Sequence, residues 1–347
     1  MSVVRGLPPV SYAHLAVMTG RHGVFEHALG AEPRRESGYC VDDVARALIV
    51  VIRDEEQAPP LRVFTEIYLR FLEGAIVEDG MAHNRMSAFG DWSDAPGLGD
   101  WWGRLIWALG VTAARAQVGS IRDRARASFH RASVARAPSL RAMAFATLGA
   151  VEVLQVDPRD DIARELARAG TAAIPVSADP GWPWPEDRLA YGNASIAEAL
   201  IAAGCALEDR AVEQRGLDLL RFLLELESTS GHLSVTGTAG RGRSDAPPQF
   251  DQQPIEIAAL ADAAARAFDV TADPRWLEGI RLAWAWFGGD NDARTVMFDA
   301  ARGSGYDGLE PAGRNDNQGA ESTLAALSTL QQARRYVVAA AWPAVMP

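Results

Sequence analysis

The feature that most constrains the fold is a helical hydrophobic period along nearly the whole chain, while strand-like alternation is scarce. Apolar residues recur at positions i, i+3 and i+4, which is the spacing of one face of an α-helix. The pattern predicts an all-α protein of about twelve amphipathic helices. We expect them at residues 10–19, 41–54, 60–78, 100–118, 120–134, 138–154, 159–173, 193–207, 209–228, 254–269, 273–288 and 317–336.

The connections between these helices alternate between short and long. Short links follow the helices that end near residues 54, 118, 154, 207 and 269. Two antiparallel helices joined by a short link form a hairpin, and about six hairpins in a ring form an (α/α)6 toroid. The long connections are rich in Gly, Pro, Trp and acidic residues, and they lie at 79–99, 174–192, 229–253 and 289–316. In a toroid they emerge at one end, before inner helices that start near 41, 100, 138, 193, 254 and 317.

A solenoid of helical repeats is the competing architecture. Its repeats have near-constant length, whereas the spacing between the predicted inner-helix starts varies here, which favours the toroid. A chain of 347 residues can bury one large core, and no low-complexity linker divides it. We therefore predict one toroid domain over residues 1–347, with a C-terminal tail at 337–347.

The composition excludes several classes of function. All 34 basic residues are arginine, so the chain can form neither a lysine Schiff base nor a Walker A phosphate loop. The net charge of −11 argues against nucleic acid and anionic membranes as partners. Cys40 and Cys205 lie far apart and the histidines form no i, i+4 pair, so we expect no metal and no cofactor, with a calcium ion bound by carboxylates as the open alternative. Because neither a signal peptide nor a membrane-spanning apolar run is visible, we expect a cytoplasmic protein.

Residues suited to binding sugars gather at the predicted loop end of the ring. Five of the ten tryptophans lie there, and aromatic faces suit the C–H faces of sugar rings. Asp, Asn, Gln and Arg side chains supply the paired hydrogen bonds that hydroxyl groups need. The alternative is that the tryptophans plug the barrel mouth and the acids cap helices. The predicted substrate-binding residues are His83, Asn84, Arg85, Asp91, Trp92, Asp100, Trp101, Trp102, Arg104, Trp182, Trp184, Glu186, Asn193, Gln252, Gln253, Asn317 and Gln318.

The adjacent acids Asp42 and Asp43 open one predicted inner helix. Neighbouring helical positions point about 100° apart, so one carboxylate can face the cavity while the other packs beneath it. Their repulsion raises the pKa of one of them, which is how a general acid arises, although adjacent acids at a helix start are also a common structural feature. Glu256 and Glu321 lie one turn into two other inner helices, where a capping box is the alternative. Together with Asp187 they complete the candidate catalytic residues.

The runs GYCVDDVARAL, HNRM, DWWGRLIWALG, GWPWPED, YGNASIAEALI, FDQQPIEIAALADA and NDNQGAESTLAAL resemble a family of bacterial six-hairpin glycosidase-like proteins. The resemblance spans residues from about 20 to 336. Members occur alone or fused to retaining-type glycosyltransferases, so the resemblance implies a toroid, carbohydrate chemistry and association with a glycosyltransferase. More distantly, the adjacent acids are similar to the paired aspartates of the family 76 endo-α-1,6-mannanases. That similarity implies Asp42 as nucleophile and Asp43 as acid/base, although Arg46 replaces an aromatic residue usual nearby.

The leading hypothesis is a glycoside hydrolase that cleaves a cytoplasmic oligosaccharide, which the mannanase similarity implies is mannose-containing. One carboxylic acid protonates the leaving oxygen and a second carboxylate acts as base or nucleophile. Three alternatives stay open. A sugar epimerase on the same fold needs paired histidines, and His83 and His232 are the two in the predicted loops. A non-catalytic glycan-binding partner of a glycosyltransferase needs the tryptophans but not the acids, and a solenoid module for protein interaction needs a long concave face.

Overall fold

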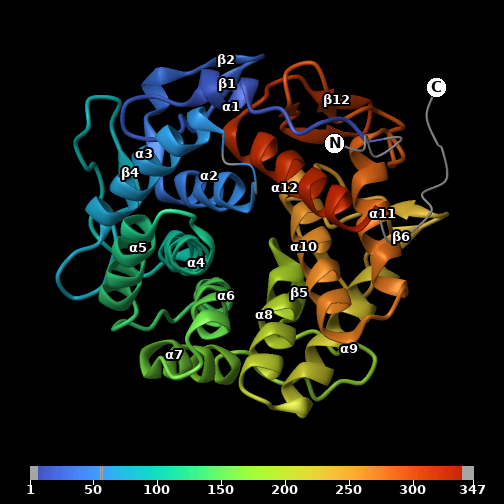
Figure 1. Ribbon diagram of the computed structural model, residues 1–347. Helices are drawn as coiled ribbons and strands as arrows, with labels where there is room; N and C mark the ends of the chain where they lie inside the picture. Colours follow the sequence, from blue (N-terminus) through green and yellow to red (C-terminus); the bar gives the residue numbers. More distant parts are fainter. Residues whose placement is uncertain (1–6, 55, 57, 338–347) are drawn as a thin grey trace.

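The computed structural model describes residues 7–54, 56 and 58–337, and this part of the chain folds into an (α/α)6 toroid (Figure 1). Each inner helix packs against the next one, and the last packs against the first, which closes the ring. The six inner helices are α2 (Val41–Arg53), α4 (Asp100–Arg115), α6 (Leu140–Val156), α8 (Asn193–Ala206), α10 (Pro254–Thr271) and α12 (Ala320–Val337). The predicted all-α toroid is therefore confirmed.

The outer layer consists of helices that each pack against the inner helix preceding them in the chain. Around the ring these are α3 (Pro59–Ala75), α5 (Gly119–Ala132), α7 (Asp161–Ala172), α9 (Arg210–Leu226) and α11 (Arg275–Phe287). The short helix α1 (Ala13–Met18) packs against α12 and so joins the two ends of the described chain. A single 3-10 turn, η1 (Arg35–Ser37), precedes α2.

Helices α4 and α6 approach each other unusually closely because glycines face the contact. A Cβ atom added at Gly103 or Gly110 lies 2.2 Å from a backbone oxygen of α6, and one added at Gly149 lies 2.3 Å from a backbone oxygen of α4. Side chains larger than hydrogen therefore cannot be placed there without moving the two helices apart. The inner helices are apolar on nearly all sides, as expected for helices surrounded by other helices.

The long loops pair with one another through short antiparallel strands. β3 (Tyr39–Cys40) pairs with β4 (Arg85–Met86), and β5 (Arg188–Leu189) pairs with β8 (Arg241–Gly242). These two pairings fasten loops that precede different inner helices. The other pairs are hairpins within one loop: β1 (Ala28–Leu29) with β2 (Glu32–Pro33), β6 (Ser228–Thr229) with β7 (His232–Leu233), β9 (Phe298–Asp299) with β10 (Ser304–Gly305), and β11 (Gly308–Glu310) with β12 (Gly313–Asn315).

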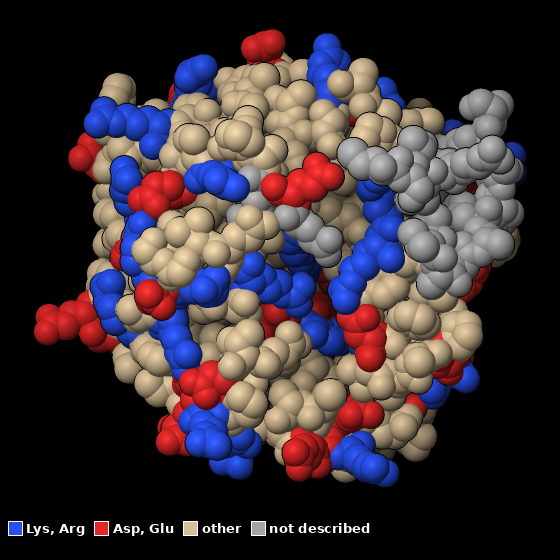
Figure 2. All heavy atoms as spheres, in the orientation of Figure 1, with Lys and Arg blue, Asp and Glu red and all other residues tan. Residues whose placement is uncertain are grey.

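The helix starts expected from the sequence agree with the structure at 41, 100, 193 and 254, and differ by two or three residues at the other two inner helices. Of the expected C-terminal tail, residues 338–347 lie outside the described residues. None of the helices in the described ranges has the length and apolar character needed to cross a membrane. On the face shown in Figure 2, basic and acidic side chains are interspersed around a central hollow.

Candidate active site

A polar cavity of about 380 Å³, which we call the mouth, lies at the N-terminal ends of the inner helices. It combines side chains from the starts of α2, α4 and α12 with residues of the long loops. Its lining consists of Glu26, His27, Cys40, Asp42, Asp43, Arg46, Arg85, Arg104, Tyr191, Gln253, Asp307, Gly319, Glu321 and Ser322. Six of the residues predicted for the site, namely Asp42, Asp43, Arg85, Arg104, Gln253 and Glu321, meet in this one cavity.

Asp42 is the more accessible of the two adjacent acids, with 22% of its side chain exposed. Its Oδ1 accepts a hydrogen bond from Nη1 of Arg104 on α4 at 2.8 Å. Burial favours the neutral carboxyl group, but Arg104 and Arg46 outweigh it and hold the pKa of Asp42 below its usual value. Asp42 is therefore an ionised carboxylate at the cavity surface.

Asp43 lies beneath Asp42, with 4% of its side chain exposed. Arg46, one turn further along α2, donates to its Oδ1, and the Cys40 thiol donates to its Oδ2 at 3.0 Å. Burial, reinforced by the carboxylates of Glu321 and Asp42, raises the pKa of Asp43 to about 7 against the opposing effect of Arg46. The two neighbouring acids therefore occupy opposite electrostatic environments.

Glu321, at the start of α12, faces Asp43 across Arg46. Its Oε2 lies 2.8 Å from Nη2 of Arg46, so one guanidinium bridges carboxylates of two inner helices. The Glu321 side chain is 38% exposed, which makes it the most accessible of the three acids. Asp307 also borders the mouth and accepts hydrogen bonds from the backbone of Gly319 and the hydroxyl of Ser322.

Sequence reasoning missed Glu26 and His27, which reach the mouth from the segment before β1. Backbone hydrogen bonds hold this segment against the start of α12, because Ala320 donates to the carbonyl of Glu26 and Gln318 to that of Gly30. Glu26 is ion-paired with Arg85. No local motif marks these residues, since only the pairing of distant segments brings them to the cavity.

The predicted tryptophan platforms do not line the mouth in this structure. Trp102 and Trp184 are fully buried in the core, and the indole of Trp102 donates to the carbonyl of Gly80. Trp182 is also buried, with its indole packed edge-on against Phe222 of α9. Trp101 covers Gly97 and Gly99 and donates to the carbonyl of Ala82. These large apolar rings fill space between loops and helices, which corresponds to the plug alternative.

Residues of the loop before α4 are mostly engaged with one another. The His83 ring stacks on the Trp92 ring with 5.1 Å between their centroids, and its Nδ1 forms a hydrogen bond with the carbonyl oxygen of Asp94. The Asp94 carboxylate accepts a hydrogen bond from the backbone N–H of Asn84. Asp91 is exposed at the outer turn. Of the predicted loop residues 83–92, Arg85 alone is among the residues that line the mouth in the described chain.

Several predicted site residues instead fasten helix starts and loops. Glu256 accepts hydrogen bonds from the backbone of Gly192 and from the side chain of Asn193, and both side chains are buried. Burial and the neighbouring Glu227 raise the pKa of Glu256 to about 8. This carboxyl group therefore holds the start of α8 in place from beneath the loop.

The remaining predicted residues have structural partners as well. Gln252 is buried between Asp292 and the indole of Trp286. The side chains of Asn317 and Gln318 bond Gly30 and Ser304. Asp100 accepts hydrogen bonds from the hydroxyl groups of Ser139 and Tyr191. Glu186 forms an ion pair with Arg141. Asp187 is exposed and does not belong to the lining of the mouth.

Glu26, Cys40 and Asp43 form a group whose potential metal-ligand atoms lie within 4.8 Å of one another. Their chemistry in this structure is that of a hydrogen-bonded cluster. Arg85 and Arg46 already bind the two carboxylates. Burial raises the pKa of the Cys40 thiol well above its usual value, so the sulfur is a neutral donor to Asp43.

No family model matches the chain, and no curated protein resembles it significantly in sequence. Solved structures do resemble its fold. A sugar epimerase from a ruminal bacterium superposes with a TM-score of 0.69 at 12% identity, covering 93% of this chain and 95% of that chain. Cellobiose 2-epimerase from Bacillus thermoamylovorans gives a TM-score of 0.70 at 11% identity with the same coverage. A GH76 alpha-mannanase from Bacteroides thetaiotaomicron gives 0.64 at 10% identity, covering 93% of this chain and 94% of that chain. The structural neighbours are thus enzymes of the six-hairpin glycosidase-like fold.

Proposed function

We propose that the chain is a glycoside hydrolase whose catalytic carboxylates are Asp42 and Asp43. The observation that carries this proposal is the pair of neighbouring carboxyl groups that border one open polar cavity in opposite electrostatic environments. Glycosidases need one protonated and one ionised carboxyl group at the bond that they cleave. Arg104 keeps Asp42 ionised, while Asp43 has a pKa near neutrality.

In the proposed reaction, Asp43 transfers its proton to the glycosidic oxygen as the bond from that oxygen to the anomeric carbon breaks. The leaving sugar departs as an alcohol. Asp42 either adds to the anomeric carbon, with water later releasing the sugar, or removes a proton from the attacking water. Arg46 is a positioning residue because it holds both Asp43 and Glu321. The configuration of the released anomer distinguishes the two roles of Asp42.

The charges of the mouth support a neutral oligosaccharide as the substrate. Each of its three arginines is paired with a carboxylate of the same cavity: Arg46 with Asp43 and Glu321, Arg85 with Glu26, and Arg104 with Asp42. The guanidinium charges are thus already compensated, whereas a phosphate group needs uncompensated ones. We propose mannose-containing oligosaccharides as the first substrates to test, because one structural neighbour is described as an alpha-mannanase.

A sugar epimerase is the second candidate, because two of the structural neighbours are described as epimerases. We expect that reaction to need two histidines, one as acid and one as base. His83 stacks on Trp92 and His232 pairs with Asp292, and neither belongs to the lining of the mouth. His27 does line the mouth, but its side chain is 56% exposed. The carboxylate pair therefore gives more support to hydrolysis.

One experiment separates these candidates. The purified chain is incubated with α- and β-linked manno- and gluco-oligosaccharides, and products are followed by chromatography that resolves chain length and epimers. We expect shorter oligosaccharides, with activity lost in Asp42→Asn and kept in Asp187→Asn, the matched exposed control. Products of unchanged length with an altered sugar contradict hydrolysis and establish epimerisation. If calorimetry shows that an oligosaccharide binds but neither product forms, the result contradicts both enzyme functions and supports a non-catalytic glycan-binding protein.

A further inference from the structure

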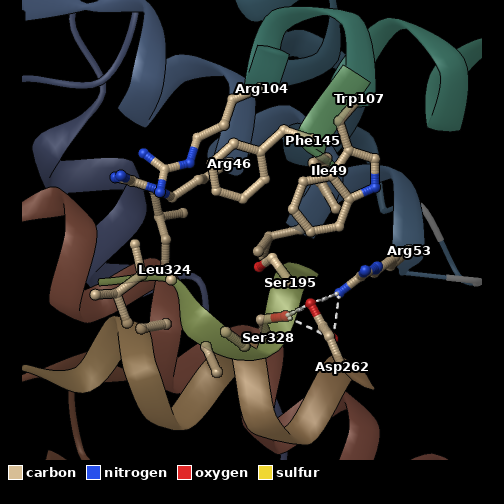
Figure 3. A pocket seen from close by; sticks show the side chains of 16 residues that line it. Arg46, Ile49, Arg53, Arg104, Trp107, Phe145, Ser195, Asp262, Leu324 and Ser328 are labelled. Carbon is tan, nitrogen blue, oxygen red and sulfur yellow. Dashed lines mark hydrogen bonds and ion pairs between the residues drawn. The ribbon is translucent and has the colours of Figure 1, made fainter. Parts of the chain in front are cut away.

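A second space lies next to the mouth, enclosed by the inner helices, and most of its lining is apolar. This space, which we call the chamber, has a volume of about 60 Å³. Figure 3 shows Ile49, Trp107, Phe145 and Leu324 around it, contributed by α2, α4, α6 and α12. The chamber therefore has apolar walls, although it borders on a cavity rich in charge.

The chamber exists because inner helices present small side chains to the axis. On α10 the axial stripe is Ile255, Ala258, Ala259 and Asp262, at the i, i+3, i+4 and i+7 positions of one face. Ala258 and Ala259 keep 8% and 9% of their surface accessible, whereas Ala261 on the same helix is fully buried. The inner surface of the ring is thus incompletely filled at this level.

Charged side chains bound the chamber at both ends. At one end Arg53 donates to Asp262 at 2.9 Å and to the hydroxyl of Ser328 at 2.8 Å. At the other end Arg46 and Arg104 line both the chamber and the mouth, so the two spaces share a boundary at these side chains (Figure 3). The Arg104 guanidinium lies over the Phe145 ring, 4.4 Å from its centroid. A ligand in the mouth therefore has an apolar space directly adjoining it.

The walls and volume of the chamber define what it can accept. A sugar hydroxyl placed against Ile49, Phe145 and Leu324 loses its hydrogen bonds to water, which is unfavourable. The apolar part of the wall therefore favours an apolar group over a hydroxyl group. An apolar cavity of about 150 Å³ binds benzene, which has six heavy atoms, so a chamber of about 60 Å³ has room for about two heavy atoms.

We propose that the substrate carries a short apolar substituent, of one to three heavy atoms, that enters the chamber while the sugar hydroxyls bind in the mouth. The methyl group of a deoxy sugar, an O-methyl group and the methyl end of an acetyl group share this chemistry. The inference rests on the proposed function only in that the mouth binds a sugar. It identifies the class of sugar, which the carboxylate pair does not.

The test measures binding of matched pairs of sugars by calorimetry, and so does not depend on turnover. The pairs are glucose and 6-deoxyglucose, mannose and 6-deoxymannose, glucosamine and N-acetylglucosamine, and methyl and propyl glucoside. In at least one pair we expect the more apolar member to bind about three- to tenfold more tightly, since each buried methylene group contributes about fourfold. The pair that shows the gain identifies the source of the substituent.

Ala259→Leu fills the chamber and should abolish this gain while leaving the affinity for the parent sugar unchanged. Ala172→Leu, at the exposed end of α7, is the matched control and should keep the gain. If the Ala259→Leu variant is unfolded at the temperature of the calorimetry, the variant with the smaller substitution Ala259→Val is measured in its place. The proposal is overturned if no pair shows a gain, including the case in which no sugar binds, or if the gain survives filling. Hydrolysis without any gain contradicts the chamber proposal alone, and a gain without hydrolysis contradicts the proposed function alone.

Discussion

The two ends of the ring carry similar clusters of acids and arginines, yet some of the carboxyl groups in them border a cavity and others do not. The mouth, with a volume of about 380 Å³, is lined by Asp42, Asp43 and Glu321 together with Arg46 and Arg104. Further along the same inner helices lies a second set, which we call the inner ion cluster. It consists of Arg53, Arg115, Glu152, Glu198, Asp262 and Arg266.

In the inner ion cluster the carboxylates are almost fully enclosed. Glu152 binds both Arg115 and Arg266, and its side chain is 2% exposed. Burial and Asp262 raise the pKa of Glu198 to about 7, the same value as that of Asp43. A raised pKa therefore does not distinguish catalysis from structure in this molecule. What distinguishes the two sets is that Asp42, Asp43 and Glu321 line the mouth, whereas Glu152 and Glu198 line neither the chamber nor the cavity of about 500 Å³ that Arg53 and Arg115 border. We therefore assign chemistry to the mouth and stability to Glu152 and Glu198.

The largest expected effect is on turnover at the mouth. Asp43→Asn removes the proposed proton donor and should lower kcat by about 10²- to 10⁴-fold, the usual contribution of general acid catalysis. Glu321→Gln should be nearly as damaging, because it removes one of the two carboxylates that Arg46 bridges and one of the charges that raise the pKa of Asp43. Glu198→Gln, which changes a carboxyl group of the same pKa in the inner ion cluster, should leave kcat within about threefold, since it does not touch substrate. If Asp43→Asn keeps more than about a tenth of wild-type kcat, less than about 1.4 kcal/mol of barrier is involved and the acid is structural.

The next effect is on stability, and here a substitution in the inner ion cluster should be more damaging than one in the mouth. Glu152→Gln removes the buried counter-charge that Arg115 and Arg266 share and leaves Arg266 with its longer pair to Glu198 at 3.8 Å. We expect the free energy of unfolding to fall by about 3–5 kcal/mol, as measured by urea denaturation. Asp42→Asn in the partly accessible mouth should cost clearly less. Equal losses for the two variants would mean that the mouth is as structural as the inner ion cluster.

Trp184 tests whether tryptophans near the loops are platforms or plugs. Its ring is buried, so Trp184→Ala should lower the free energy of unfolding by about 3–5 kcal/mol. Glycan affinity of the folded fraction should stay unchanged, because the ring does not line the mouth. A weaker affinity with unchanged stability would restore the platform interpretation.

A smaller effect is the dependence of stability on pH. The folded-state pKa values of Asp43 and Glu198 are about 7, above those of unfolded carboxyl groups at about 4. The folded chain thus binds more protons than the unfolded chain between these values, and its free energy of unfolding should fall as the pH rises from 5 to 8. Glu198→Gln should reduce this slope in urea titrations. A stability that rises over this range contradicts the assigned pKa shifts.

Much of the fold could be predicted from the sequence because it depends on local periodicity. Small errors occur where side chains hold the chain out of the helix. Ser139 caps α6 through the backbone of Ala142, so that helix starts at Leu140 and not at 138. Asn317 and Gln318 bind Gly30 and Ser304, so α12 starts at Ala320 and not at 317.

The site could be predicted only in part. Asp42, Asp43 and Glu321 were identifiable because each lies in the first turn of an inner helix, whose end the toroid directs to the mouth. Glu26 and His27 were not, because strand pairing and backbone bonds between distant segments bring them there. Trp107 and Phe145 were missed for another reason. In the sequence they look like ordinary core positions of inner helices, and only the ring geometry turns them toward the axis.

The central claim, that Asp43 is the acid and Asp42 the ionised partner, is tested most directly by the pH dependence of kcat/KM for wild-type hydrolysis. We expect a bell-shaped profile. Activity should fall above about pH 7 as Asp43 loses its proton, and below the usual range for a carboxyl group as Asp42 gains one. A kcat/KM that stays constant or rises from pH 6 to pH 9 would contradict the assignment.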